Sequence, residues 1–489
     1  MFLSCGKIKI NTLLCTRCQM ICRKNQSKLT IPKKIVLIMK NTRREFIKTS
    51  ASLTGLGMVA AGDLLAATSK RETKKTPSDQ IRVGLIGCRS QGFTNLTSMM
   101  RNDSSVVCAA LADVDQNVLN GRLADIQKDF PNNGKVEGYS DYRKILDDKT
   151  IDTVIIGTPD HWHCLQFVEA CQAGKNILVE KPISNYIAEA EIMLAAAKRY
   201  NVIACVNQHQ RSGEEWIKAM EIVKSGILGQ ITRVDIWANF GYAVGGPIVA
   251  DSPIPEGVDF DRWLGPAKKR TFNERRYHGS WRMFWDYGGG LMTDWGVHLL
   301  DMGMWAMDSE GVMPNQIYSN GGRFAFLDRA SETASTQTAV YQFDNWQMTW
   351  SQNAGIQEGP YGRLYGVAFI GTFGTLVADR DGFEVFSEWS NELKKRLFEP
   401  IPKFEGDRRS QDRHTAAFIE CIKNDNRNTP CTLQAGRDAA LLAHMANISY
   451  RMGGAPLTYD ATTQRFIDNE KANAMLFPKY RAPYQLPVI

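Results

Sequence analysis

The run IRVGLIGCRSQG, residues 81–92, decides the fold. Its first six residues are mostly apolar and rich in β-branched types, which is typical of a buried strand. The next six, GCRSQG, keep the first and third glycines of the G-x-G-x-x-G pattern, Gly87 and Gly92, and place Arg89 in the middle position. The first glycine permits a tight turn and the last lets a helix approach the strand closely. The run therefore predicts a strand–turn–helix unit that can hold a dinucleotide.

Four further apolar runs follow at residues 106–114, 153–157, 176–179 and 202–206. Helical patterns lie between them, including residues 163–173 and 187–200. Apolar strands that alternate with helices indicate a parallel, doubly wound α/β sheet, because such a sheet is buried on both faces. We expect this Rossmann domain to span residues 79–205.

Asp113 ends the second predicted strand, 21 residues after Gly92. At that place an acidic side chain accepts hydrogen bonds from the ribose hydroxyls of NAD and repels the 2′-phosphate of NADP. The sequence therefore favours NAD, while the cation of Arg89 leaves NADP open. The competing interpretation is a strand–helix turn that binds no cofactor.

The pattern of polar and apolar residues changes after residue 207. Strand-like segments at 231–239, 338–350 and 366–373 mix polar with apolar residues, as in an antiparallel sheet with one covered face. Helical patterns occupy 292–307, 414–423 and 435–451. We expect residues 206–489 to form an α+β domain with a large, mostly antiparallel sheet that binds substrate and supports oligomerisation.

Four short motifs resemble the Gfo/Idh/MocA oxidoreductases, in particular their exported branch. They are TPDHWH at 158–163, EKP at 180–182, WRMFWDYGGGLMTDWGVH at 281–298 and GTFGTL at 371–376. The resemblance covers about residues 79–485. It implies hydride transfer between NAD(P) and a hydroxyl of a sugar, glycoside or cyclitol, in a homo-oligomer such as a dimer or tetramer. It also implies Lys181, Asp294 and His298 as catalytic residues.

The spacing of these residues is consistent with that chemistry. Asp294 and His298 are four residues apart and would share one face of a helix. A histidine oriented by a carboxylate suits removal of the hydroxyl proton, and Lys181 at a strand's carboxyl end would stabilise the alkoxide. Asp301, one further turn along, could belong to the same face. The alternative is a hydrogen-bonded pair on a helix surface.

The predicted binding residues form two groups. For the cofactor they are Gly87, Arg89, Ser90, Gln91, Gly92, Asp113, Thr158, Pro159, His161, His163, Glu180 and Lys181. For the substrate they are Gln208, Arg211, Tyr277, Arg282, Asp294 and His298. Residues 207–211 could instead be a polar hinge, and the aromatic residues around 277–282 could be core.

Asp160, His161 and His163 raise the question of a metal site. Zinc sites show tighter His and Cys clustering, and in the resembling family this loop lines the nicotinamide. We predict no metal.

Charge is distributed unevenly along the chain. The formal net charge is +7, but residues 1–75 hold 16 of the 59 Lys and Arg residues and three of the 52 acidic ones. The rest of the chain therefore has a net charge of −6. A nucleic-acid partner, which needs a basic patch on a folded domain, is not indicated. No apolar run reaches the ~18 residues of a membrane span, so no transmembrane segment is predicted.

The basic leader resembles a twin-arginine export signal. TRREFIK at 42–48 carries the arginine pair, a mildly apolar stretch follows at 51–61, and small residues stand at 66–67. We predict a signal peptide over 39–67, a linker over 68–78 and a periplasmic or otherwise exported protein. Residues 1–38 are interpreted as a mis-called extension before the true start at Met39. The competing interpretation of the leader is a short amphipathic helix.

Export has a consequence for the cofactor, because free NAD is scarce outside the cytoplasm. We therefore expect tightly bound NAD and 3-keto-sugar chemistry. The first alternative is an NAD-dependent glycoside hydrolase that oxidises, eliminates, hydrates and reduces, although the sequence assigns no tyrosine to its proton abstraction. The second alternative, from another class, is a catalytically silent sugar-binding protein.

Overall fold

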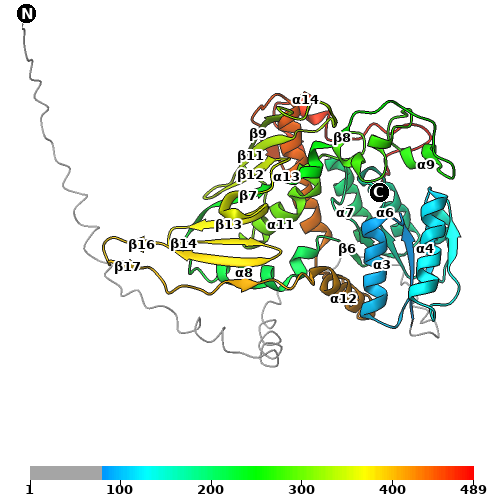
Figure 1. The fold of residues 1–489 in the computed structure, drawn as a ribbon, viewed down its shortest axis with the longest axis horizontal. Helices are drawn as coiled ribbons and strands as arrows, with labels where there is room; N and C mark the ends of the chain where they lie inside the picture. The colour runs from blue at the N-terminus through cyan, green and yellow to red at the C-terminus, as the bar shows by residue number, and fades with distance from the viewer. Residues whose placement is uncertain (1–79) are drawn as a thin grey trace, which may run out of the picture. The chain divides into compact units, whose positions relative to one another are not determined.

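The computed structural model describes residues 80–489. The predicted extension at 1–38, the signal peptide at 39–67 and the linker at 68–78 lie outside these residues. Two sheets organise the described part of the chain, one parallel and one mixed (Figure 1).

The first sheet is parallel throughout, with six strands in the order β3-β2-β1-β4-β5-β6. Its strands are β1 (Ile81–Ile86), β2 (Val106–Ala112), β3 (Glu137–Tyr139), β4 (Thr153–Ile156), β5 (Asn176–Val179) and β6 (Ala204–Val206). The connecting helices are α3 (Ser90–Asn102), α4 (Gln116–Asp129), α5 (Arg143–Asp147), α6 (His163–Gln172) and α7 (Ile187–Tyr200). This order confirms the predicted doubly wound sheet. Only β3, a polar edge strand of three residues, has no counterpart in the sequence prediction.

The strand order reverses direction at β1, which lies between β2 and β4. In such a sheet the connections diverge at the switch point and leave a crevice beyond the carboxyl ends of the strands. The turn after β1 is fixed to both neighbours: the Gly87 amide donates to the Ala112 carbonyl at 2.9 Å, and the Gly157 amide donates to the Ile86 carbonyl at 2.8 Å.

The second sheet has eight strands in the order β18-β15-β14-β13-β7-β12-β11-β9. They are β7 (Ile231–Ala238), β9 (Gln316–Gly322), β11 (Thr336–Gln342), β12 (Gln347–Asn353), β13 (Tyr365–Gly371), β14 (Gly374–Asp379), β15 (Gly382–Ser387) and β18 (Phe404–Glu405). The pairings in this sheet are antiparallel except that of β7 with β12, which is parallel. Helices α8 (Glu214–Lys224), α11 (Gly296–Ala306) and α13 (Leu433–Arg451) pack against this sheet. The predicted, mostly antiparallel sheet is confirmed.

Two sequence predictions in this domain need correction. The segment 338–350, taken as one strand, is a hairpin of β11 and β12, because Asp344 and Asn345 form a turn between them and the Phe343 amide donates to the Trp346 carbonyl at 3.0 Å. The helix expected over 292–307 is broken at Trp295 into α10 (Leu291–Asp294) and α11.

Shorter elements complete the second domain. They are the pairs β8 (Gly246–Pro247) with β10 (Arg329–Ala330), β16 (Trp389–Ser390) with β17 (Lys395–Arg396) and β19 (Tyr459–Asp460) with β20 (Arg465–Phe466), and the helices α9 (Phe260–Leu264), α12 (Ser410–Lys423) and α14 (Glu470–Asn473).

Helix α12 does not stay with the sheet that precedes it. It lies beside α3 of the parallel domain, as Figure 1 shows, where Ser98 Oγ donates to Asp412 Oδ1 at 2.7 Å and Asn102 Nδ2 donates to the Asp412 carbonyl at 2.7 Å. Helix α12 thus belongs to the second domain by sequence, but it covers α3 of the parallel domain.

The seven cysteines of the described residues are all buried and unpaired. Within residues 80–489, no helix is long and apolar enough to cross a membrane, and no cluster of three or more His, Cys, Asp or Glu side chains is arranged to hold a metal.

Candidate active site

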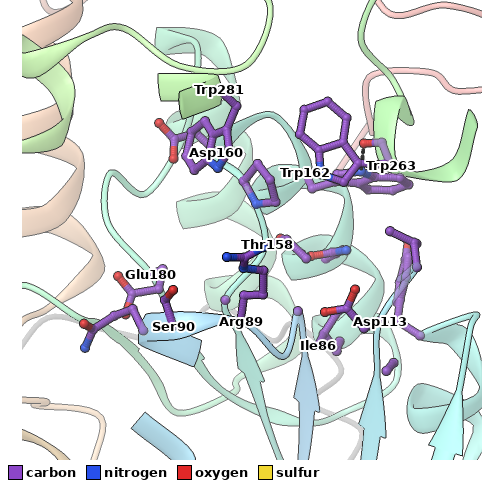
Figure 2. Close-up of a pocket in the computed structure, with 18 of the residues that line it drawn as sticks. Ile86, Arg89, Ser90, Asp113, Thr158, Asp160, Trp162, Glu180, Trp263 and Trp281 are labelled. Carbon is purple, nitrogen blue, oxygen red and sulfur yellow. Dashed lines mark hydrogen bonds between the residues drawn. The ribbon is translucent and has the colours of Figure 1, made fainter. Parts of the chain in front are cut away.

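A cavity opens at the carboxyl ends of β1, β2, β4 and β5. Its empty volume is about 1170 Å³, including open solvent at the mouth. Figure 2 shows Asp113, Thr158 and Glu180 at its strand side and Trp162, Trp263 and Trp281 around its other side. The predicted cofactor residues that line it are Gly87, Arg89, Ser90, Gln91, Asp113, Thr158, Pro159, Glu180 and Lys181. The position agrees with the crevice expected at the switch point.

The glycine turn is shaped for a close ligand. Gly87 has φ +84°, and a Cβ on Gly92 would lie 2.4 Å from the Gly87 carbonyl oxygen. Gly92 does not itself line the cavity but lets α3 pack against the turn. Arg89 is exposed at the cavity wall, where its guanidinium can face a phosphate. These residues fit a dinucleotide although the middle glycine is missing.

Asp113 stands at the end of β2, as predicted. Its Oδ2 accepts the Cys88 amide at 2.7 Å and its Oδ1 accepts the Asp115 amide at 3.0 Å, so the turn after β1 fixes this carboxyl. Burial raises the pKa of Asp113, and the two backbone donors oppose that rise. The next acid, Asp115, caps α4 and accepts His278 Nε2 at 2.8 Å.

Two predicted cofactor ligands do not reach the cavity. His161 is buried between Trp263 and Tyr287, with Nε2 3.1 Å from the Trp263 carbonyl oxygen. His163 is completely buried, and its ring nitrogens lie 2.8 and 2.9 Å from the carbonyl oxygens of Pro182 and Thr158. Burial lowers the pKa of His161 to about 3 and of His163 to about 4. Both imidazoles position the loop, and its Thr158, Pro159 and Asp160 line the cavity.

Glu180 belongs to a buried amide network. Its Oε1 accepts Asn95 Nδ2 at 2.7 Å and Asn207 Nδ2 at 2.6 Å, and Gln91 Nε2 donates to Asn95 Oδ1 at 2.9 Å. Burial raises the pKa of Glu180. The network holds the strand end that presents the adjacent Lys181.

Lys181 and Asp294 meet across the two domains. Lys181 Nζ lies 2.6 Å from Asp294 Oδ1 and 2.8 Å from the Asp294 carbonyl oxygen. Arg282 Nε donates to Oδ1 at 3.0 Å, and the Tyr242 hydroxyl donates to Oδ2 at 2.5 Å. Burial alone would raise the pKa of Asp294, but Lys181 and Arg282 hold it well below its usual range. The structure thus joins Lys181, Asp294 and Arg282 in one cluster beside the cavity.

His298 is near this cluster but is not oriented by Asp294, which corrects the predicted dyad. The break at Trp295 places Asp294 in α10 and His298 in α11, and the Asp294 carboxylate is taken by three other donors. The buried Nδ1 of His298 has no hydrogen-bond partner among the described residues. Burial, followed by the charges of Lys181 and Arg380, lowers the pKa of His298 well below its ordinary value. Its imidazole is therefore neutral, with an Nδ1 unpartnered among residues 80–489, and its lowered pKa makes it a weaker base than an ordinary imidazole.

Gln208 is completely buried, and its side-chain amide has no hydrogen bond among the described residues. Two other predicted substrate residues are held by contacts away from the cluster. Arg211 forms a fork with Asp301, Nε to Oδ2 at 2.8 Å and Nη2 to Oδ1 at 2.7 Å, which also removes Asp301 from the catalytic face. Tyr277 is buried among aromatic rings, and its hydroxyl donates to Asp115 Oδ2 at 3.3 Å. Of the predicted substrate residues, the structure brings together Arg282, Asp294 and His298.

Sequence reasoning missed Tyr242 and Arg380, and it marked His209 only as part of the polar segment 207–211. Tyr242 lies on a 3₁₀ turn, Gly241–Val244. The residue as a whole is 47% exposed, and its hydroxyl reaches inward to Asp294. His209 lies with its ring centroid 5.6 Å from that of His298. Arg380 places its guanidinium 4.4 Å from the ring centroid of Trp295. No local pattern marks these residues, because each reaches the site from a separate loop.

Comparison with known proteins follows the same division of the chain. The sequence model of the oxidoreductase family NAD-binding Rossmann fold, GFO_IDH_MocA, matches residues 81–208, and that of the family's C-terminal alpha/beta domain matches residues 214–365. The uncharacterized oxidoreductase YrbE of Bacillus subtilis is 25% identical over 380 residues, 76% of this chain and 95% of that protein.

A second relative is the alpha-N-acetylgalactosaminidase of Shewanella oneidensis. It is 26% identical over 203 residues, which are 39% of this chain and 44% of that enzyme. The chain thus matches less than half the length of this hydrolase.

Two solved structures share the fold. Levoglucosan dehydrogenase in complex with NADH and levoglucosan has a TM-score of 0.57 and 18% identity, covering 78% of this chain and 99% of that one. The WlbA dehydrogenase of Bordetella pertussis, in complex with NADH and UDP-GlcNAcA, also has a TM-score of 0.57 and 18% identity, covering 78% and 99%. With both family domains matched in order, the chain belongs to the Gfo/Idh/MocA family and is an NAD-dependent oxidoreductase.

Proposed function

We propose that this enzyme removes a hydride from a hydroxyl-bearing carbon of a sugar or glycoside, or returns one to the corresponding keto carbon, in 3-keto-sugar chemistry. The observation that carries the proposal is the contact of Lys181 with Asp294 beside the cavity. The Lys181 ammonium, the Asp294 carboxylate and the neutral imidazole of His298 lie near one another, next to the residues predicted to bind the dinucleotide.

Each group has a chemical task in this proposal. Lys181 donates two hydrogen bonds to Asp294, and its third N–H is available to a substrate hydroxyl. Asp294 holds the Lys181 ammonium in place, so that this cation can stabilise an alkoxide as the hydroxyl loses its proton. His298, held neutral by burial, accepts the hydroxyl proton. When bound along the glycine turn, NAD supplies the hydride acceptor.

A glycoside hydrolase of the oxidise–eliminate–hydrate–reduce type is the second candidate. It is favoured by the Shewanella hydrolase relatives and by Tyr242, whose hydroxyl contacts Asp294 and could take part in removing a second substrate proton. The third candidate is a silent sugar-binding protein, against which the presence of Lys181, Asp294 and His298 speaks.

The deciding experiment uses the purified protein with its NAD and a panel of glycosides. A rise in absorbance at 340 nm supports the oxidoreductase, release of free sugar without net NADH supports the hydrolase, and binding alone supports the silent protein. Lys181→Met should reduce turnover by about 10³-fold, since it removes the charge that stabilises the alkoxide. The matched control is Lys224→Met, which breaks a surface ion pair with Asp308. Full turnover by Lys181→Met would remove the catalytic assignment.

We also propose export by the twin-arginine route to the periplasm, with NAD retained by the chain. The support is the sequence of residues 39–67. Fractionation of cells that express Arg43→Lys with Arg44→Lys, a charge-conserving pair, should find the variant in the cytoplasm. Mass spectrometry of small molecules released from protein purified without added cofactor should detect NAD.

The outer face of the eight-stranded sheet supports a further proposal, a homo-oligomer. On the face away from the helices, Trp237, Ala368 and Val377 form a separate buried cluster, while Tyr361 and Phe386 beside it are 53% and 46% exposed. Exposed aromatic rings around an apolar cluster are typical of subunit contacts. Light scattering after size exclusion should show a dimer or tetramer that Phe386→Glu weakens.

A further inference from the structure

Arg380 is a cation without an acidic partner near the catalytic cluster. It lies in the turn between β14 and β15, mostly buried, with its guanidinium over the indole of Trp295. Its Nε donates to Gln210 Oε1 at 3.1 Å, and its two terminal nitrogens have no hydrogen bond to any of residues 80–489. A largely buried guanidinium is costly unless an anion compensates it.

The acids around Arg380 are already paired with other cations. Asp379, its neighbour in sequence, binds Arg363 Nη1 at 2.8 Å, and Asp381 binds Arg408 Nε at 2.6 Å. Asp294 is held by Lys181 and Arg282. No described carboxylate lies within 4.0 Å of the Arg380 guanidinium.

Glu215 is the remaining acid near Arg380. Both of its carboxyl oxygens are buried without a hydrogen bond among the described residues, and burial raises its pKa to about 7. Glu215 is therefore only partly ionised at neutral pH and compensates Arg380 poorly.

The catalytic region as a whole has an excess of positive charge. Lys181, Arg282 and Arg380 face one strongly acidic carboxylate, Asp294, because burial raises the pKa of Asp160 well above its ordinary value. The positive charges also act on the two nearby imidazoles. Burial lowers the pKa of His209, and the charge of Arg380 lowers it further. Burial likewise lowers the pKa of His298, and the charges of Lys181 and Arg380 lower it further.

Arg380 lies close to the catalytic cluster, although it is not among the residues that line the cavity. Its guanidinium lies over Trp295, and the ring centroid of Trp295 lies 5.7 Å from that of His298. Trp295 directly follows Asp294 in the chain. Arg380, His298 and Asp294, which binds Lys181, thus all lie next to Trp295.

We propose that the substrate is an anionic sugar whose carboxylate or other oxyanion pairs with Arg380. The guanidinium fork matches the planar geometry of a carboxylate, as in a uronic acid, and would also accept a phosphate ester. This inference rests on the proposed function, since it assumes that a sugar occupies the site.

The test compares neutral and anionic sugars of the same configuration. NAD-loaded enzyme is assayed at 340 nm with methyl β-D-glucoside and methyl β-D-glucuronide, with the corresponding galactosides, and with glucose and glucose 6-phosphate. We expect kcat/KM for the anionic member of at least one pair to exceed that of the neutral member by at least tenfold. The uronide and phosphate arms distinguish a carboxylate substrate from a phosphate ester.

Arg380→Gln keeps a polar side chain beside Gln210 but removes the charge. It should lower kcat/KM for the preferred anionic sugar at least tenfold more than kcat/KM for its neutral partner, which changes only through the effect of Arg380 on the pKa of His298. The matched control is Arg408→Gln, which removes the same charge from an exposed partner of Asp381. Thermal melting checks that each variant folds, and quenching of tryptophan fluorescence reports sugar binding independently of turnover.

The possible outcomes separate the inference from the function on which it rests. Equal or better turnover of neutral sugars would overturn the anionic substrate and leave the oxidoreductase intact. Equal losses of Arg380→Gln on both members of a pair would make Arg380 a general structural residue and would also overturn the inference. Conversion of no sugar in any arm, with NAD bound, would overturn the proposed function itself.

Discussion

Asp294 shows how a single carboxylate can organise a site without touching its expected partner. Spacing alone paired it with His298, but the structure gives its two oxygens to Lys181, Arg282 and Tyr242. These contacts keep Asp294 ionised and hold Lys181 in position, while burial keeps His298 neutral. The distinction matters for acid–base chemistry, because a carboxylate partner would raise the pKa of His298, whereas burial and the nearby cations lower it.

Tyr242→Phe tests the contribution of the phenol to this arrangement. A hydrogen bond to a charged group contributes about 1.5–3 kcal/mol, so kcat/KM should fall by about tenfold or more. Tyr361→Phe is the control, because Tyr361 is similarly exposed, at 53%, on the outer face of the sheet. Steady-state kinetics on both variants give the comparison, and equal kcat/KM for Tyr242→Phe and wild type would contradict it.

The titration of His298 is a second prediction at this scale. Its pKa lies below 6.5 because of burial first and of the positive charge of Lys181 next. Lys181→Met should therefore raise the pKa of His298 while leaving it below 6.5, since burial remains. Nitrogen-15 NMR of the imidazole measures both values, and an unchanged or lower pKa in the variant would count against the assignment.

At the scale of elements, the predictions succeeded where burial imposes a simple pattern. Parallel strands covered on both faces are continuous apolar runs, so β1, β2, β4 and β5 were predicted nearly as they stand. The hairpin of β11 and β12 was missed because its strands share one alternating pattern and its turn is only Asp344-Asn345. The contacts of Tyr242 and Arg380 depend on how loops dock across the domains, which no local pattern records.

The start of α7 makes stability depend on pH. Glu189 Oε2 accepts the amides of Asn185 and Tyr186, both at 2.9 Å, and Tyr480 donates to Oε1 at 2.5 Å. Burial raises the pKa of Glu189 from 4.5 to about 7. Between these values the folded state holds more protons than the unfolded state, so this group's contribution to stability is full below pH 4.5 and falls as pH rises to 7.

Glu189→Gln removes the titration but keeps an acceptor for the helix cap. The free energy of unfolding of wild type, measured relative to this variant, should fall by about 3 kcal/mol between pH 4.5 and 7.5. Urea unfolding at both pH values gives the difference. A difference that is constant across this range, or that grows with pH, would contradict the prediction.

At the scale of the molecule, the last residues of the chain support the cavity. Arg481 Nε donates to the Gly265 carbonyl at 2.7 Å, and the ring of Tyr484 lies edge-on to Trp162 with centroids 5.4 Å apart. Trp162 lines the cavity, and its indole nitrogen donates to the Trp263 carbonyl at 3.0 Å. The C-terminal tail thus packs behind one wall of the cofactor site.

Removal of residues 477–489 should therefore weaken NAD binding by about tenfold and lower the melting temperature, since it uncovers Trp162 and leaves Glu189 without Tyr480. Val488→Ser is the control, because Val488 is 94% exposed. Isothermal titration and thermal melting provide the two measurements. An unchanged affinity for NAD in the truncated protein would show that the cavity does not depend on the C-terminal tail.

The position of α12 has a consequence for synthesis. The ribosome completes β1 to β6 at residue 206, about two-fifths of the 489 residues, yet the helix that covers α3 begins only at Ser410. Until then, the buried polar side chains of α3, such as Ser98, lack their partners. The nascent nucleotide domain thus lacks this covering helix until α12 has been made, so residues that are translated late govern when this enzyme first becomes competent.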